Sequence, residues 1–438
     1  MNIVLLSGGS GKRLWPLSND VRSKQFIKIF HNDDGELESM VQRVYGQIRR
    51  MDPTASITIA TSKSQVSSIR NQLGDAVNVC VEPTRRDTFP AIALAASFLK
   101  DELGVADDEA VIVCPVDPYV DDSYFKCFEE LEKMVKEGTY NLNLMGVEPS
   151  YPSEKYGYIQ PDTKDHISAV SAFREKPDVE TAQKYIDEGA LWNCGVFAFK
   201  LSYILDRAHE LIKFEGFTDL RDHYGDCKKI SFDYAVGEHE KSIGVVRFSG
   251  DWKDIGSWNT FAEEMHEPFI GKGEMDDSCV NSNVVNELDI PIIAMGLKDM
   301  VVAASNDGIL VADKEQSSYI KPYVEKITDN IRFAEKSWGS FTVVDVQSNA
   351  LVIRVVLLPG NRLKYHSHQH RDEVWTIMEG TGTVILDGEK RQVSVGDVIS
   401  MKAGQKHTII ADTKLVVNEV QLGEDISEQD KIKYDFPE

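Results

Sequence analysis

Short apolar runs alternate with stretches of three- and four-residue hydrophobic spacing over residues 1–265. Four such runs predict buried strands, over residues 3–7, 56–61, 78–81 and 110–115. Near-continuous apolar strands suit a parallel sheet that is covered on both faces. The longer spacing predicts helices over residues 91–103 and after Asp121 or Asp122, the latter ending near Gly138. The alternation therefore predicts a doubly wound α/β domain with a mostly parallel sheet.

The pattern changes after residue 265. Residues 283–327 contain short β-like runs, as at 300–304 and 309–312, and predict a small β-rich connecting domain. From residue 339 onward apolar and polar residues alternate along strands, with turns such as Asp387-Gly388 between them. This alternation predicts a C-terminal all-β barrel. We therefore expect three domains, over residues 1–265, 266–332 and 333–438.

The bulk composition, with 42% hydrophobic and 27% charged residues, is typical of a globular protein. The formal net charge of -23 argues against nucleic acids and anionic membranes as partners. No apolar run is long enough for a membrane span or a signal peptide, and the six cysteines form no C-x-x-C pair. These features predict a cytoplasmic protein with reduced thiols. We also expect a homodimer or higher homo-oligomer, formed through the β-rich C-terminal region.

The first predicted strand runs into a glycine-rich turn, Ser7-Gly8-Gly9-Ser10-Gly11-Lys12-Arg13-Leu14. Glycines let a ligand approach the backbone closely, and consecutive N–H groups before a helix suit a phosphate chain. Lys12, Arg13 and Lys24 add positive charge, which an acidic protein needs locally to bind phosphorylated substrates. A Walker A loop is excluded because Arg13 follows the lysine, and a G-x-G-x-x-G fingerprint is excluded because Leu14 occupies its last position.

The turn continues as Trp15-Pro16-Leu17-Ser18 and, with Lys24-Gln25-Phe26, closely resembles the signature of the bacterial mannose-1-phosphate guanylyltransferases. Further segments resemble that family in the same order: Glu82-Pro83, Arg86-Asp87-Thr88, Pro90-Ala91, Pro115-Val116-Asp117, Tyr156-Gly157-Tyr158-Ile159, Phe173-Arg174-Glu175-Lys176-Pro177, Trp192-Asn193-Cys194-Gly195 and Trp252-Lys253-Asp254-Ile255-Gly256-Ser257-Trp258. The resemblance implies a Rossmann-like nucleotidyltransferase domain.

The same resemblance implies transfer of a nucleotidyl group from GTP to mannose-1-phosphate, giving GDP-mannose and pyrophosphate. It implies catalytic roles for Arg13 and Lys24, which would stabilise phosphate charge, and for Asp117 and Asp254, which would hold Mg²⁺. The implied nucleotide-binding residues are Leu6, Gly8, Gly9, Ser10, Gly11, Lys12, Glu82, Arg86, Asp87 and Thr88. The implied sugar-phosphate-binding residues are Gly157, Glu175, Lys176 and Asn193.

Alternative interpretations stay open at this point. Most such charged residues, taken singly, would be helix caps or solvated side chains. Asp87 stands where the family usually has asparagine, and Pro118 stands where histidine is usual. Another base, or another hexose- or heptose-1-phosphate, is therefore an alternative. A non-catalytic sugar-nucleotide sensor is a further alternative, which the presence of both acidic and basic catalytic positions disfavours.

The C-terminal region contains Gly360-x5-His366-x-His368-x4-Glu373-x6-Gly380 and Gly396-x7-Gly404-x2-His407, and both spacings resemble cupin motifs. Strand alternation puts His366 and His368 on one face of a strand. The resemblance implies that Glu373 and His407 join them from neighbouring strands. Three imidazoles and one carboxylate suit a divalent transition metal such as Zn, Mn, Fe or Ni. In bifunctional relatives this domain is a type II phosphomannose isomerase. Two roles are open, mannose-6-phosphate isomerisation or a cupin that serves metal binding or subunit contact.

Overall fold

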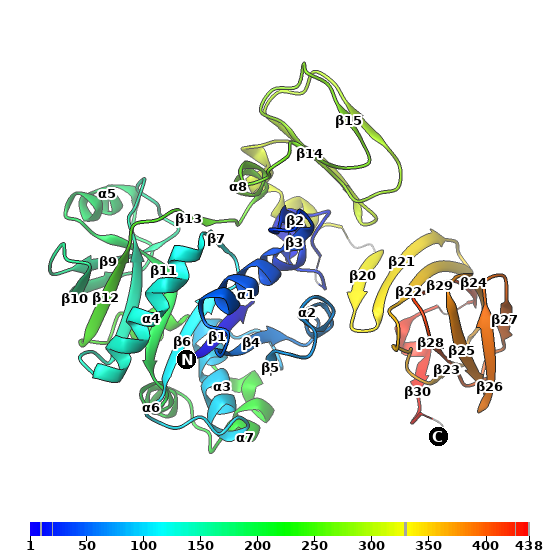
Figure 1. Cartoon of the computed structure of the whole chain (residues 1–438), viewed down its shortest axis with the longest axis horizontal. Coiled ribbons are helices and arrows are strands. Elements are labelled where there is room, and N and C mark those ends of the chain that lie inside the picture. Colours follow the sequence, from blue (N-terminus) through cyan, green and yellow to red (C-terminus); the bar gives the residue numbers. More distant parts are fainter. Residues whose placement is uncertain (9–10, 20, 328–330, 425, 437–438) are drawn as a thin grey trace. The chain divides into compact units, whose positions relative to one another are not determined.

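The structure is a computed structural model that describes residues 1–8, 11–19, 21–327, 331–424 and 426–436 (Figure 1). The chain forms two compact units. Unit 1 contains Met1–Ser10, Gln25–Val66 and Leu73–His266, and unit 2 contains Gly11–Lys24, Ser67–Gln72 and Glu267–Glu438. The three-domain division, with boundaries near residues 265 and 332, stays a prediction.

Within its described residues, unit 1 is built on a sheet of nine strands (Figure 1). In sheet order the strands are β5 (Asn78–Glu82), β4 (Ser56–Ser62), β1 (Asn2–Ser7), β6 (Ala110–Pro115), β11 (Leu191–Lys200), β8 (Leu142–Val147), β12 (Ile243–Phe248), β10 (Ile167–Arg174) and β9 (Gly157–Pro161). Their pairings place β10 and β11 in one direction and the other seven strands in the opposite direction. The predicted mostly parallel sheet is confirmed.

Apolar side chains are buried on both faces of this sheet, which explains the near-continuous hydrophobic runs. Val4 and Val113 share one core with helices α3 and α6, and Ile3 and Ile112 are equally buried on the other face. The α-helices of unit 1 are α1 (Met40–Met51), α3 (Thr88–Asp101), α4 (Asp122–Glu137), α5 (Val179–Asp187), α6 (Leu201–Leu211), α7 (Phe217–Asp222) and α8 (Trp258–Glu263). Helix α2 (Val66–Leu73) falls largely in unit 2, which contains Ser67–Gln72. Shorter elements are η2 (Lys24–Phe26), η3 (Tyr224–Asp226), η4 (Asp233–Gly237), β2 (Lys28–His31), β3 (Leu37–Ser39), β7 (Pro118–Val120) and β13 (Trp252–Asp254).

Helix α4 begins and ends where the sequence predicts. The Asp121 carboxylate accepts a hydrogen bond from the Ser123 N–H at 2.7 Å, so it caps the first turn. Gly138 closes the helix at φ +70°, a conformation that glycine adopts without steric cost. Helix α3 begins three residues earlier than predicted, because Asp87 caps it and Pro90 lies inside its first turn.

Unit 2 contains a set of parallel β-coils between residues 269 and 313. Strands β14 (Phe269–Gly271), β16 (Asn283–Asn286) and β18 (Met300–Ser305) pair in parallel, β19 (Gly308–Asp313) joins them antiparallel, and β15 (Gly273–Met275) pairs with β17 (Ile292–Ala294). Gly273 has φ +141°, and a Cβ there would lie 1.9 Å from the Ile292 carbonyl oxygen. Only glycine fits this corner. The region is β-rich as predicted, although η5 (Gln316–Tyr319) and α9 (Lys321–Val324) follow it.

The segment Gly11–Lys24, which starts with η1 (Gly11–Leu14), belongs to unit 2 because it is bonded to these coils. The Arg22 guanidinium donates to a Glu287 carboxylate oxygen at 2.8 Å, and the Asn19 amide donates to Asp307 at 2.7 Å. The Ser305 hydroxyl donates to the Pro16 carbonyl at 2.7 Å. Although burial opposes the charge of Arg22, the carboxylate of Glu287 raises the pKa of its guanidinium.

The C-terminal part of unit 2 is an antiparallel barrel made of two sheets (Figure 1). One sheet contains β20 (Phe333–Lys336), β21 (Gly339–Val346), β22 (Ala350–Leu357), β29 (Leu415–Gly423), β24 (Arg371–Glu379) and β27 (Val398–Met401). The other contains β26 (Glu389–Ser394), β25 (Thr381–Leu386), β28 (His407–Ala411), β23 (His366–His368) and β30 (Lys431–Lys433), and η6 (Glu428–Asp430) precedes β30. Trp375, Ile377 and Val417 belong to the core between the sheets. The predicted barrel and its Asp387-Gly388 turn are confirmed.

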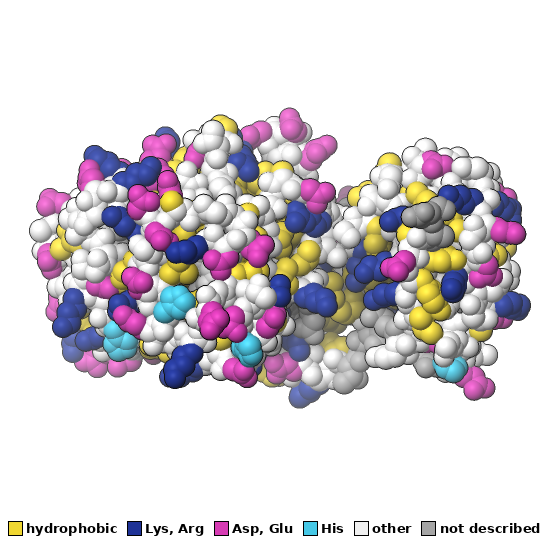
Figure 2. Space-filling model, turned by 90° about the horizontal axis from the view of Figure 1, so that it is seen from below, with side chains coloured by type: hydrophobic (Ala, Val, Ile, Leu, Met, Phe, Trp, Pro, Cys, Tyr) yellow, Lys and Arg dark blue, Asp and Glu magenta, His cyan; other side chains and the backbone are white. Residues whose placement is uncertain are grey.

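Acidic and basic side chains are interspersed on the face of the molecule that Figure 2 shows. The negative net charge is therefore not gathered into one block on that face. None of the helices formed by the described residues combines the length and the apolar character needed to cross a bilayer.

Candidate functional site

The two predicted catalytic carboxylates lie at the same edge of the unit 1 sheet. Asp117 follows β6 directly, and Asp254 ends β13, which pairs antiparallel with β7 so that Asp254 lies opposite Pro118. The Val116 N–H donates to the Leu6 carbonyl at 3.3 Å, which ties this segment to the end of β1. Both aspartates are half-buried. Open α/β sheets bind ligands at the carboxyl ends of their strands, where these two side chains lie.

An aromatic cluster connects the aspartate segment with the two predicted sugar-binding segments. The ring centroids of Tyr156 and Trp252 are 5.3 Å apart, those of Tyr156 and Trp192 are 5.0 Å apart, and those of Trp192 and Trp252 are 6.2 Å apart. Each ring is one or two positions from a predicted site residue, namely Gly157, Asn193 or Asp254. The cluster therefore brings three separate motifs together within unit 1. Burial, followed by the nearby Asp254 carboxylate, raises the pKa of Tyr156.

The predicted sugar-phosphate residues are gathered around Gly157. Gly157 on β9 lies opposite Asn193 on β11, and a Cβ at Gly157 would lie 2.5 Å from a Glu175 carboxylate oxygen. Glu175 also pairs with the Lys176 ammonium. Burial disfavours the Lys176 charge, but its bond to Glu175 raises the pKa of the ammonium overall. Glu175, Lys176 and Asn193 thus form one polar group around Gly157, where a side chain would meet Glu175.

Two further carboxylates, which no sequence motif marks, complete this polar group. The Asn193 amide nitrogen donates to Asp233 at 2.7 Å, and its oxygen accepts from the Gly195 N–H at 3.0 Å, so the amide orientation is fixed. Glu238 accepts from the Glu175 N–H at 3.2 Å. Burial, with a contribution from Glu175, raises the pKa of Asp233 to about 6. Asp233 begins η4 and Glu238 follows it directly, and their contacts with Asn193 and Glu175 are visible only in three dimensions.

The predicted nucleotide-binding residues after β5 have partners in the stretch 224–232. Glu82 accepts from the Tyr224 hydroxyl at 2.9 Å, and the Arg86 guanidinium donates to the Gly225 carbonyl. Burial raises the pKa of Glu82. Thr88 accepts from the Phe232 N–H at 2.8 Å. The 224–232 stretch carries no motif, so nothing in the sequence pointed to it.

Asp87 combines a predicted contact to the base with a local structural role. Its backbone has φ +73°, a left-handed conformation that is uncommon for a residue other than glycine, and its carboxylate accepts from the Thr88 N–H at 2.9 Å. The side chain therefore caps α3 in the structure.

The glycine-rich turn is described only in part. Gly8 is exposed at the end of β1, whereas Gly9 and Ser10 lie outside the described residues. Gly11 begins η1, in which Lys12 is half-buried and Arg13 is exposed, and Lys24 begins η2. Gly11, Lys12, Arg13 and Lys24 belong to unit 2, whereas Leu6, Gly8 and the two aspartates belong to unit 1. Their joint role in one nucleotide site stays a prediction.

In the barrel, the four predicted metal ligands converge. One ligand atom from each of His366, His368, Glu373 and His407 lies within 4.8 Å of the others, and all four residues are buried. Glu373 lies at the centre of the group, because its two oxygens are 2.9 Å from His368 Nε2 and 3.2 Å from His407 Nε2. Strand pairing produces the cluster, since His366 on β23 lies directly opposite His407 on β28.

The burial and the unpaired polar atoms of this cluster suit a divalent cation. The Arg371 guanidinium lies beside it and donates to Glu373 Oε1 and His368 Nε2, each at 3.2 Å. Burial is the main cause that lowers the pKa of His366 to about 2, so its imidazole is neutral and can act as a ligand. Although burial opposes the charge of Glu373, the neighbouring His368 and His407 lower the pKa of its carboxyl. Buried Glu373 Oε2 and His407 Nε2 have no hydrogen-bond partner among the described residues. A cation shared by the four ligands would satisfy both atoms.

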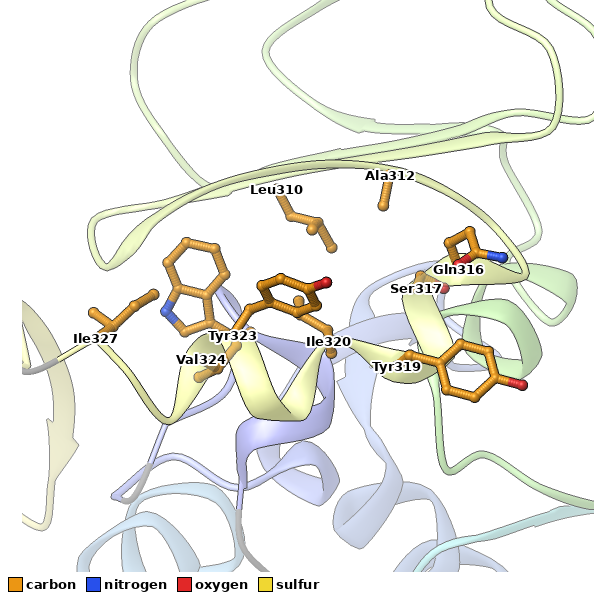
Figure 3. Close-up of a pocket in the computed structure, with 10 residues that line it drawn as sticks. Leu310, Ala312, Gln316, Ser317, Tyr319, Ile320, Tyr323, Val324 and Ile327 are labelled. Atoms are coloured by element: carbon orange, nitrogen blue, oxygen red, sulfur yellow. The ribbon is translucent and has the colours of Figure 1, made fainter.

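A separate cavity of about 240 Å³ lies in unit 2, between β19 and α9 (Figure 3). Its apolar lining includes Trp15, Leu310, Ile320 and Val324, and the residues that line it carry no charge at neutral pH. Such a lining is unsuited to a phosphorylated ligand. Trp15, which lies two residues after Arg13, forms part of this lining together with Leu310 of β19.

Two family models match separate parts of the chain. The nucleotidyl transferase family model matches residues 2–268, and the mannose-6-phosphate isomerase C-terminal model matches residues 324–436. The mannose-1-phosphate guanylyltransferase RfbM of Salmonella typhimurium is 29% identical, over 98% of this chain and 96% of the relative. A mannose-1-phosphate guanylyltransferase of Escherichia coli is also 29% identical, over 98% of both chains.

Among solved structures, the crystal structure of a protein named mannose-1-phosphate geranyltransferase from Thermus thermophilus is similar to this chain. It superposes with a TM-score of 0.61 at 27% identity, covering 74% of this chain and 98% of that one. The nucleotidyl transferase model, which matches residues 2–268, spans more than half of the chain. The nine-stranded sheet of unit 1 has the expected mostly parallel order. The chain is therefore an enzyme of the nucleotidyl transferase family.

Proposed function

We propose that the chain transfers a guanylyl group from GTP to mannose-1-phosphate, giving GDP-mannose and pyrophosphate. The observation that carries the proposal is the pairing of β13 with β7, which brings Asp254 beside the segment of Asp117. The aromatic contacts extend the same neighbourhood to Gly157 and Asn193. Relatives at 29% identity that carry the guanylyltransferase name support the choice of substrates.

The proposed reaction is an in-line displacement at the α-phosphorus of the nucleoside triphosphate. A phosphate oxygen of the sugar-1-phosphate attacks, and the bond from the α-phosphorus to the bridging oxygen of the pyrophosphate breaks. Such transfers depend on positioning and on neutralising charge more than on a protein nucleophile. Arg13 and Lys24 would stabilise the phosphate charges, and Lys176 would bind the sugar phosphate. Asp117 and Asp254 would hold Mg²⁺, which supplies further charge neutralisation.

Pyrophosphate release from GTP and mannose-1-phosphate is the direct test. We expect turnover that depends on Mg²⁺ and that Asp117→Ala lowers by at least about 100-fold, because a metal-binding carboxylate is lost. Asp108→Ala, which changes an exposed aspartate of the same unit, is the matched control and should leave turnover unchanged. A panel of other nucleoside triphosphates and hexose- or heptose-1-phosphates separates the alternatives. Turnover with another pair would change the substrates, and no turnover with any pair would favour the sensor.

The barrel supports a second candidate function, the interconversion of fructose-6-phosphate and mannose-6-phosphate. The buried cluster of three histidines and one glutamate favours it, as does the match of residues 324–436 to an isomerase C-terminal model. A metal held there would polarise the substrate carbonyl, and a base would move a proton between C1 and C2. Incubation of the zinc-, manganese-, iron- or nickel-loaded protein with fructose-6-phosphate tests this candidate. No conversion with any of these metals would leave a barrel that serves metal binding or subunit contact.

A further inference from the structure

The three histidines of the barrel cluster differ in what their second ring nitrogen contacts. His366 Nδ1 lies 2.6 Å from the Lys364 carbonyl oxygen, and His407 Nδ1 lies 3.0 Å from the Gln405 carbonyl oxygen. Each of these imidazoles therefore donates from Nδ1 and presents Nε2 to the cluster. His368 Nδ1, by contrast, is buried and has no hydrogen-bond partner among the described residues. The other ring nitrogen of His368, Nε2, lies 3.2 Å from the Arg371 guanidinium and 2.9 Å from Glu373 Oε1.

A carboxylate from the C-terminal segment lies close to this unpaired nitrogen. Asp430 Oδ2 lies 3.9 Å from His368 Nδ1, and it too is buried without a hydrogen-bond partner in the described part of the chain. The distance exceeds that of a hydrogen bond by less than about 1 Å. An imidazole N–H and a carboxylate oxygen are complementary, and leaving both buried and unpaired is unfavourable.

Asp430 is held in this position by its other oxygen. Oδ1 accepts from the backbone N–H groups of Gln369 at 2.9 Å and His370 at 3.1 Å, directly after the strand that carries His368. Strand β30 then pairs with β23, so that Lys431 lies opposite His368. The Arg371 guanidinium donates to the Ser427 carbonyl at 3.0 Å and anchors the start of the segment. The carboxylate is therefore a built part of the barrel interior.

We propose that Asp430 is a positioning residue for the metal site, accepting a hydrogen bond from His368 Nδ1–H so that Nε2 faces the metal. The C-terminal segment, residues 427–433, is then part of that site. A carboxylate that orients a ligating histidine fixes its tautomer and makes the nitrogen a better ligand. This inference rests on the proposed barrel metal site and adds to it a partner that no cupin spacing predicts.

Zinc affinity of the full-length protein tests the proposal. Asp430→Asn keeps an oxygen for the two backbone N–H groups but replaces the acceptor that faces His368. We expect Zn²⁺ binding, measured by calorimetry with a chelator as competitor, to weaken by about 10- to 100-fold. Asp412→Asn, which changes an exposed aspartate on the same barrel, should bind Zn²⁺ as the unchanged protein does. Circular dichroism of the metal-free variants checks that both are folded.

A measurement on the unchanged chain decides the matter even if the Asp430→Asn variant does not fold. In zinc-loaded protein labelled with ¹⁵N-histidine, with the signal assigned through His368→Gln, we expect His368 to bind through Nε2 and to carry a proton on Nδ1. Binding through Nδ1, or an Asp430→Asn variant that binds Zn²⁺ within about 2-fold of the unchanged chain, overturns the inference while the metal site stands. If the unchanged chain binds none of Zn²⁺, Mn²⁺, Fe²⁺ and Ni²⁺, the metal site and the inference both fail.

Discussion

At Gly157, the absence of a side chain leaves room for the neighbouring Glu175 and Asn193. A Cβ there would lie 2.5 Å from a Glu175 oxygen and 3.3 Å from the Asn193 Cβ. Glycine is required here for space, because its φ is not in the left-handed region. The residue scale is therefore where we expect sugar recognition to be most sensitive.

We predict that Gly157→Ala raises KM for mannose-1-phosphate by about 10-fold or more, because the new methyl group displaces Glu175 and Asn193 from the sugar. KM for GTP should change little. Steady-state kinetics with each substrate varied in turn measures both effects. Gly46→Ala is the matched control, since a Cβ at that helical glycine meets its nearest neighbour at 3.6 Å. Equal changes in both KM values would contradict a sugar-specific role.

The ionisation of Asp233 should be visible in the pH dependence of stability. Its pKa is about 6 in the folded chain, above the ordinary value of 3.8, so ionisation destabilises the fold. The unfavourable contribution is absent below the unfolded pKa and complete above about pH 6. We predict that Asp233→Asn gains unfolding free energy relative to the unchanged chain between about pH 4.5 and pH 7, by on the order of 1 kcal/mol. Urea unfolding at the two pH values measures the gain, and the exposed Asp162→Asn should show none.

At the scale of elements, the segment Gly11–Lys24 depends on a half-buried ion pair. The side chain of Arg22 is only 7% exposed, and its partner Glu287 is 27% exposed. Removing the carboxylate leaves a buried guanidinium without its main counter-charge. The same segment carries Lys12 and Arg13. Loss of the ion pair should therefore also disturb the predicted phosphate contacts of these two residues.

We predict that Glu287→Ala lowers the unfolding free energy of unit 2 by about 2 kcal/mol, less than for a fully buried pair because Glu287 is partly exposed. It should also raise KM for GTP. Differential scanning calorimetry and steady-state kinetics are the measurements. The exposed Glu274→Ala, on neighbouring β15, is the control. A variant with unchanged KM and melting temperature would show that the ion pair does not hold the segment.

Elements with a strong local pattern were predictable from the sequence, and those that depend on distant pairing were not. The apolar runs predict β1, β4 and β6 because both faces of those strands are buried, and they predict β5, which is a half-buried edge strand. The reversed directions of β10 and β11, by contrast, follow from long-range pairing. The same reason applies to the site. Motif spacing predicts Asn193 and His368, whereas their partners Asp233 and Asp430 are 40 and 62 residues away in the chain.

At the scale of the whole molecule, the chain contains two compact units with different candidate chemistry. The predicted sugar and Mg²⁺ residues belong to unit 1, and the barrel cluster belongs to unit 2. The cluster is enclosed within its own barrel, with its four ligands on β23, β24 and β28. Changes in the cluster should therefore affect one activity without the other.

We predict that His366→Ala and His407→Ala abolish metal binding by the barrel and any fructose-6-phosphate conversion, while pyrophosphate release from GTP and mannose-1-phosphate stays within about 2-fold of the unchanged chain. Metal analysis and the two activity assays on the same preparations measure this. A parallel loss of both activities would mean that the barrel metal also supports nucleotidyl transfer.

The local bonds of His366 and His407 have one more consequence. Each ring is oriented by the carbonyl oxygen of the residue two positions earlier in the chain, so no ion is needed to choose its tautomer. Backbone carbonyls therefore orient two of the three imidazoles before any ion binds, and under our proposal the Asp430 carboxylate orients the third. Treatment with a strong chelator should strip the barrel and leave its melting profile cooperative, and returning the cation should restore the loaded protein without any refolding step.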